Sequence, residues 1–113
     1  MTRLTRRSVL GAAAALPVAA CAPRATPPRT PLRAVTFNIW HDAGNWPLRL
    51  KLLTDVLRAA DADVIALQEV LQDSKKNLPN QAETIAAALG GYTAHFMSTS
   101  PEGAANRYGN AIL

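Results

Sequence analysis

The stretch that decides the fold of this chain is Asp63-Val64-Ile65-Ala66-Leu67-Gln68-Glu69-Val70. Its four consecutive apolar residues are too few for an independent helix and predict a strand buried on both faces, as in a parallel sheet covered by helices. Glu69 is expected at the carboxyl end of this strand. Because ligands bind at that end in open α/β sheets, Glu69 is the best candidate for an active-site residue.

The preceding residues complete a strand-helix-strand unit. Residues 34–40 alternate apolar and polar side chains and predict a first strand, with Asn38 near its carboxyl end. Apolar residues at helical spacing predict a helix over residues 46–60, with Asn45 as its cap. Strands joined by such a crossover run parallel, so their carboxyl ends share one edge of the sheet. We therefore expect Asn38 and Glu69 to meet there, although they are far apart in the sequence.

The remaining residues predict more of the same sheet. We expect a polar loop over residues 71–80, a second helix from there to Leu89, and strands over residues 92–97 and 108–113. Two helices cannot cover so apolar a sheet, and the chain stops inside the last strand. The prediction is an incomplete α/β fold that forms the amino-terminal portion of a larger protein.

Charge is distributed unevenly along the chain. The formal net charge is +4, but the residues before Ala34 contain six Arg and no acid. From Ala34 onward, six Lys and Arg face eight Asp and Glu, a net charge of −2. The part that folds therefore has no basic stripe, and charge gives no support to a nucleic-acid partner.

Residues 1–20 predict an export signal. Arg3, Arg6 and Arg7 precede an apolar segment over residues 9–20 that is too short to span a bilayer. The residues around the arginine pair resemble the twin-arginine consensus. The general secretory route stays open, because paired arginines also occur in ordinary signals.

A lipid anchor is predicted at Cys21. Val18-Ala19-Ala20-Cys21 resembles a lipobox, in which the cysteine becomes the lipid-bearing first residue; the alternative is a plain signal with an incidental cysteine. As Cys21 is the only cysteine, an intrachain disulfide is impossible. Residues 21–33 contain four of the eight prolines and predict a stiff linker. We expect an exported protein, lipid-anchored on the periplasmic or cell-surface face of a membrane.

Three blocks, in this order and spacing, resemble the endonuclease/exonuclease/phosphatase superfamily over residues 34–113. They are Thr36-Phe37-Asn38-Ile39, residues 63–70, and Tyr108-Gly109-Asn110-Ala111-Ile112-Leu113. The resemblance implies a four-layer, DNase-like α/β sandwich, of which this chain is the amino-terminal part. It also implies hydrolysis of phosphate esters with Mg²⁺ or Mn²⁺.

The resemblance assigns roles to individual residues. Glu69 matches the family's metal-ligand glutamate, and Asn38 matches the asparagine that supports the metal and the phosphate, so both are candidate catalytic and metal residues. His41 and Asn110 are candidate substrate contacts, with a solvated loop histidine and a turn amide as the alternative interpretations. The family's late Asp and His would lie beyond Leu113.

The leading hypothesis is an exported, monomeric, divalent-metal-dependent phosphoesterase, inactive as the 113-residue piece alone. The alternative hypothesis is a non-catalytic surface lipoprotein that keeps the same scaffold for binding. The sequence leaves the substrate open among nucleic acid, phospholipid, inositol phosphate and other phosphate esters.

Overall fold

The computed structural model describes residues 30–113. The predicted signal peptide, Cys21 and most of the predicted linker lie outside the described residues. The elements are seven, in chain order: β1 (Ala34–Asn38), α1 (Trp46–Ala60), β2 (Val64–Asp73), the 3₁₀ turn η1 (Ser74–Lys76), α2 (Gln81–Leu89), β3 (His95–Ser98) and β4 (Asn106–Ile112).

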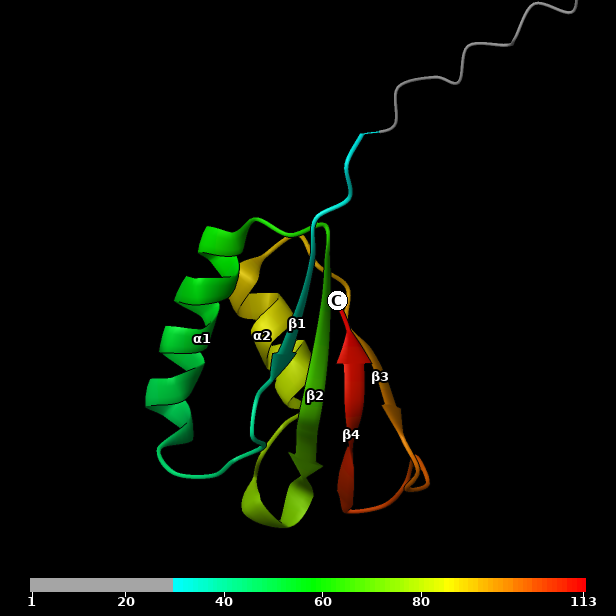
Figure 1. The fold of residues 1–113 in the computed structure, drawn as a ribbon. Helices are drawn as coiled ribbons and strands as arrows, with labels where there is room; N and C mark the ends of the chain where they lie inside the picture. The colour runs from blue at the N-terminus through cyan, green and yellow to red at the C-terminus, as the bar shows by residue number, and fades with distance from the viewer. Residues whose placement is uncertain (1–29) are drawn as a thin grey trace, which may run out of the picture.

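The four strands form one mixed sheet with the order β1-β2-β4-β3. β1 and β2 are parallel, whereas β4 is antiparallel to both β2 and β3. Both helices lie on the same face of the sheet, with α2 behind β1 and β2 in the view of Figure 1. The predicted α/β class and the parallel strand-helix-strand unit are confirmed.

Helix α1 has the predicted bounds because its signals are local. The Asn45 side chain accepts a hydrogen bond from the Leu48 N–H at 3.1 Å, and Pro47 occupies the first turn, where its missing N–H costs nothing. The helix ends where Asp61 adopts the left-handed conformation. Asn80 caps α2 in the same way, accepting from the second and third N–H groups after it.

The core lies between the sheet and the two helices. Its largest fully buried aliphatic side chains come from β2, from the two helices and from the residue just after β1, and each is worth roughly 1.5–3 kcal/mol by burial. They are Ile39, Leu57, Ile65, Leu67, Val70 and Ile85. Ile39, just after β1, lies on the helix-facing side as the alternating pattern predicts.

Strand β2 is longer than the sequence pattern predicts. Residues 71–73, expected to begin a polar loop, continue the strand because β4 pairs with them through Asp73. Asp73 also bridges Leu78, which closes the following turn. The prediction that Glu69 ends its strand is therefore wrong. Glu69 lies within β2, just past the last β2 residue that pairs with β1.

A β-bulge interrupts β2 at Gln68 and Glu69. The register with β4 shifts between Leu67 and Val70, and Glu69 has a φ of +58°. Leu67 and Val70 both point into the core although strict alternation would place them on opposite faces. Gln68 and Glu69 consequently both lie on the side of the sheet away from the core.

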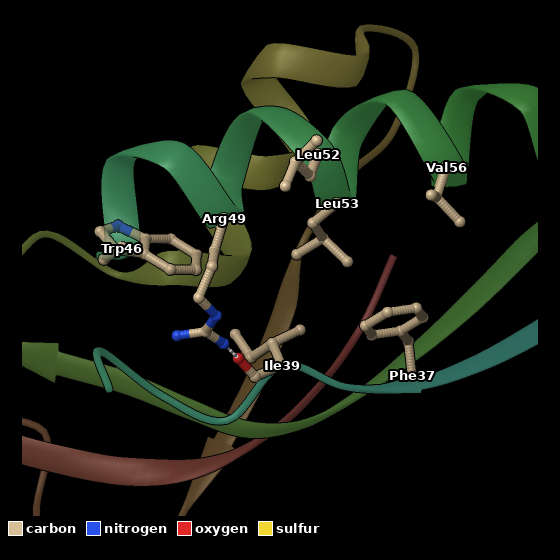
Figure 2. A pocket seen from close by; sticks show the side chains of 7 residues that line it. All are labelled: Phe37, Ile39, Trp46, Arg49, Leu52, Leu53 and Val56. Atoms are coloured by element: carbon tan, nitrogen blue, oxygen red, sulfur yellow. Dashed lines mark hydrogen bonds between the residues drawn. The ribbon is translucent and has the colours of Figure 1, made fainter. Parts of the chain in front are cut away.

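An apolar groove runs between α1 and β1. Phe37, Leu52 and Val56 line it and keep 36%, 56% and 56% of their surface exposed. In Figure 2, Leu53 and Val56 point from α1 toward Ile39 and Phe37 on the β1 side of the groove. β1 is an edge strand, so this side of the sheet has no neighbour within the described residues. None of the helices in the described part is long and apolar enough to cross a membrane.

Gly109 is required where β4 passes β3. A Cβ added there would overlap the Met97 carbonyl oxygen and lie 2.9 Å from its carbonyl carbon, whereas one added at Gly103 meets nothing within 4 Å. We predict that Gly109→Ala lowers the free energy of unfolding by about 1–3 kcal/mol, and that Gly103→Ala changes it by less than about 0.5 kcal/mol. Urea denaturation measures both. Equal stabilities of the two variants would contradict the packing described for β3 and β4.

Candidate functional site

Asn38 and Glu69 meet where β1 ends, beside β2, as predicted. The Asn38 amide nitrogen donates to Glu69 Oε1 at 2.9 Å. The register places Asn38 beside Gln68, so the bulge brings the next residue, Glu69, within reach of the amide. The Asn38 Oδ1 accepts the Trp40 N–H at 2.9 Å. Asn38 thus holds the Glu69 carboxylate from the β1 side.

Strand β4 adds two residues on the other side of Glu69. Asn110 lies opposite the bulge, because its neighbours Gly109 and Ala111 pair with Val70 and Leu67, and it is exposed. Tyr108 pairs with Leu71, so its partly exposed side chain lies diagonally across from Glu69 on the same face of the sheet. Loss of water around the phenol and then the negative charge of Glu69 raise the pKa of Tyr108 above its ordinary value. Three neighbouring strands therefore contribute to one polar row.

His41 is held at the end of this row. Its Nδ1 lies 3.0 Å from Asp42 Oδ1, and Lys76 Nζ donates to the other Asp42 oxygen at 2.7 Å. The imidazole edge packs against the Tyr108 ring, with 6.1 Å between centroids. Because Asp42 engages Nδ1, the other ring nitrogen, Nε2, is the one available to a ligand.

Asp42 is ionised at lower pH than an ordinary aspartate. The Lys76 ammonium first, and then His41, lower the pKa of Asp42 below 3.8. A lowered folded-state pKa stabilises the fold above the ordinary value, and this contribution disappears as the pH falls through the lowered value. The contribution is small because half of the Lys76 side chain is exposed, at 55%.

Arg49 on α1 organises the loop that carries His41. Its guanidinium donates to the carbonyls of Ile39 and Ala43, the first of which is drawn in Figure 2. It also lies over the rings of Trp40 and Trp46, at 5.4 and 5.9 Å from their centroids. Trp40 and the residue after it have positive φ, a conformation that costs about 1–3 kcal/mol per residue unless its surroundings enforce it.

Gln81 fixes the same loop from α2. This fully buried side chain donates from Nε2 to the His41 carbonyl at 2.9 Å and accepts the Leu71 N–H through Oε1 at 2.9 Å. The loop after β1 is thereby joined to β2 beyond the bulge. Because the nitrogen and the oxygen of the Gln81 side-chain amide both form hydrogen bonds inside the fold, its role is structural rather than ligand-binding.

The donor set fits a hard, well-hydrated cation. In residues 30–113 no three His, Cys, Asp or Glu side chains gather, and Glu69 is the carboxylate of the row. Mg²⁺ keeps several waters and is bound through one or two carboxylates together with substrate phosphates. A structural zinc site would need four protein ligands, which this row does not supply.

Sequence reasoning missed the supporting residues. Arg49 and Gln81 occupy ordinary helix positions, and Asp42 lies in a turn, so no motif distinguished them. Tyr108 belongs to one of the three blocks, but its strand begins at Asn106, earlier than predicted, and only the register shows that it pairs with Leu71 and lies diagonally across from Glu69.

Comparisons with known proteins agree with this geometry. The model of the Endonuclease/Exonuclease/phosphatase family matches residues 35–113. This chain belongs to that family. A search of curated proteins found no match.

A solved structure supports the family's fold. An endonuclease/exonuclease/phosphatase family protein from Leptotrichia buccalis C-1013-b is similar with a TM-score of 0.56 and 20% sequence identity. The match covers 73% of this chain and 37% of that one, so the chain spans well under half of its structural relative. The four-stranded sheet with two helices is thus part of the DNase-like fold of the family, as predicted.

We predict that Arg49→Lys loosens the loop after β1. Lysine cannot donate to several carbonyls from one planar group, so the free energy of unfolding should fall by about 2 kcal/mol. Both tryptophans of the chain contact Arg49, so their fluorescence emission should shift to longer wavelength. Arg33→Lys, in an exposed pair with Asp61, is the control and should leave the emission unchanged. An unaltered spectrum in Arg49→Lys would show that the guanidinium does not hold the loop.

Proposed function

We propose that this chain carries part of the active site of a divalent-metal-dependent phosphoesterase, with Glu69 as a ligand to Mg²⁺ or Mn²⁺. The observation that carries the proposal is the hydrogen bond from Asn38 to Glu69 across two parallel strands. It leaves the carboxylate half-exposed on the side of the sheet away from the core, fixed in direction by a neighbour. Membership of a family of hydrolases supports the same reaction class.

In this proposal each residue of the polar row has a separate role. Bound at Glu69, the ion would polarise a phosphoryl oxygen and offset the negative charge that develops during attack. Asn38 keeps the carboxylate directed away from the core. His41, whose Nδ1 is engaged by Asp42, presents Nε2 to the substrate, and Asn110 offers an amide opposite the bulge.

We also propose that the general base and further ligands come from a part of the full-length protein outside residues 30–113. No three His, Cys, Asp or Glu side chains gather within residues 30–113, and the chain spans 37% of its structural relative. The open apolar groove along β1 supports the same idea, because more of the domain would cover it. The substrate is a phosphate ester, and the negative charge of the folded part disfavours a nucleic acid.

The amino-terminal motifs support export and anchoring. We propose that residues 1–20 direct the protein out of the cytoplasm and that Cys21 receives the lipid that holds it to a membrane. The proline-rich linker up to Arg33 would then separate the catalytic domain from the lipid surface.

We predict that Glu69→Gln in the full-length protein lowers Mg²⁺-dependent hydrolysis of bis-p-nitrophenyl phosphate by about 10²-fold or more. The amide still accepts from Asn38, so the fold stays intact, but it contributes no charge to the ion; the loss follows from several kcal/mol of lost charge stabilisation. Glu102→Gln, in an exposed loop, is the matched control and should retain full activity.

Two results would contradict this proposal. Activity of Glu69→Gln equal to that of the Glu102→Gln control would remove Glu69 from the site. Absence of hydrolysis of both diester and monoester substrates by the wild-type protein, with Mg²⁺ and with Mn²⁺, would favour the non-catalytic scaffold instead.

We predict that Cys21→Ser releases the protein from the membrane. Serine cannot form the thioether, so the variant should lose labelling by radioactive palmitate and move from the membrane fraction to the soluble one. Ala22→Ser is the control and should stay lipid-labelled. Membrane association of Cys21→Ser equal to wild type would show that the cysteine is incidental.

A further inference from the structure

Trp40 is a large aromatic residue in the loop directly after β1, and 59% of its surface is exposed. Its backbone N–H donates to Asn38 Oδ1 at 2.9 Å, and the nitrogen of the same side-chain amide donates to Glu69 Oε1 at 2.9 Å. The N–H of the next residue, His41, donates to the Glu69 carbonyl at 3.0 Å. These three hydrogen bonds fix the backbone of Trp40 beside the residue proposed to bind the ion.

The indole of Trp40 is held by Arg49 and is otherwise largely open to solvent. The Arg49 guanidinium lies over the ring, 5.4 Å from its centroid, and donates to the carbonyls of Ile39 and Ala43 in the same loop. The Trp40 backbone has a φ of +54°, a conformation that a large side chain adopts only where its surroundings enforce it. An aromatic side chain with few rotatable bonds loses little conformational entropy when a ligand packs against it. The exposed surface of the indole is therefore suited to binding a ligand.

We propose that Trp40 is a specificity-determining residue, which stacks its exposed indole on a planar ring in the organic part of the phosphate ester. The inference rests on the proposed function, since it assumes that the phosphate binds through the ion at Glu69. An indole surface attracts any planar π-system without a charge or a fixed hydrogen-bond pattern, so aryl groups and nucleobases share this chemistry. Trp40 contacts the organic group and takes no part in breaking the ester bond.

The test compares inhibitors of Mg²⁺-dependent hydrolysis of bis-p-nitrophenyl phosphate by the full-length protein. Diphenyl phosphate and the methyl ester of adenosine 5′-monophosphate carry rings, whereas diethyl phosphate offers no ring for stacking. The ring preference is the inhibition constant of diethyl phosphate divided by that of the ring-bearing inhibitor. Trp40→Ala should lower this preference by about 5-fold or more, and Trp40→Phe, which keeps a smaller ring, should lower it less. A drop confined to the adenosine ester identifies a nucleobase, and a drop confined to diphenyl phosphate identifies an aryl group.

Leu48→Ala is the matched control, because Leu48 is a similarly exposed apolar residue near the start of α1, with 55% of its surface exposed. It should change the ring preference by less than about 2-fold. An unchanged preference in Trp40→Ala, or an equal drop in Leu48→Ala, would overturn the inference. A loosened loop would raise all the inhibition constants together and leave the preference unchanged, which also overturns it. If the wild-type protein hydrolyses no phosphate ester, the proposed function fails, and the role of Trp40 fails with it.

Discussion

The bulge at Gln68 and Glu69 is the constraint on which the rest of the site depends. In a regular strand, the residue two after Leu67 would point into the core, where an unpaired carboxylate is strongly unfavourable. The extra residue turns Glu69 to the opposite side and returns Val70 to the core. The left-handed backbone of Glu69 costs about 1–3 kcal/mol, a strain that the pairing of β2 with β1 and β4 maintains. Non-glycine residues in this conformation often lie at functional sites.

The helices support the site through side chains that donate to backbone carbonyls of the loop after β1. Arg49 from α1 donates to the Ala43 carbonyl, and Gln81 from α2 donates to the His41 carbonyl. Neither side chain belongs to the polar row itself. The loop has two consecutive positive φ angles, so its carbonyls do not join a regular helix or sheet pattern. The side chains of Arg49 and Gln81 supply the hydrogen bonds that these carbonyls need. The position of His41 thus depends on the same packing that buries the core.

The sequence predicts what local signals determine. The bounds of α1 follow from Asn45, Pro47 and apolar spacing, and the meeting of Asn38 with Glu69 follows from the parallel crossover of a strand-helix-strand unit. The predicted β2 is too short because residues 71–73 are strand only through their pairing with β4, a contact across more than thirty residues. An apolar run without alternation gives no sign of a bulge. The direction of the Glu69 side chain therefore follows only from the register between β2 and β4.

A single carboxylate suits the proposed reaction for an electrostatic reason. One carboxylate leaves a bound divalent ion with a net positive charge, which attracts the anionic phosphate of a substrate; several carboxylates would neutralise the ion and repel the substrate. Affinity for the ion then depends on direction more than on charge. The hydrogen bond from Asn38 on the neighbouring strand restricts the Glu69 side chain, so less conformational entropy is lost when the ion binds. In the proposed function, the hydrogen bond from Asn38 is therefore part of what makes one acid sufficient on this side of the site.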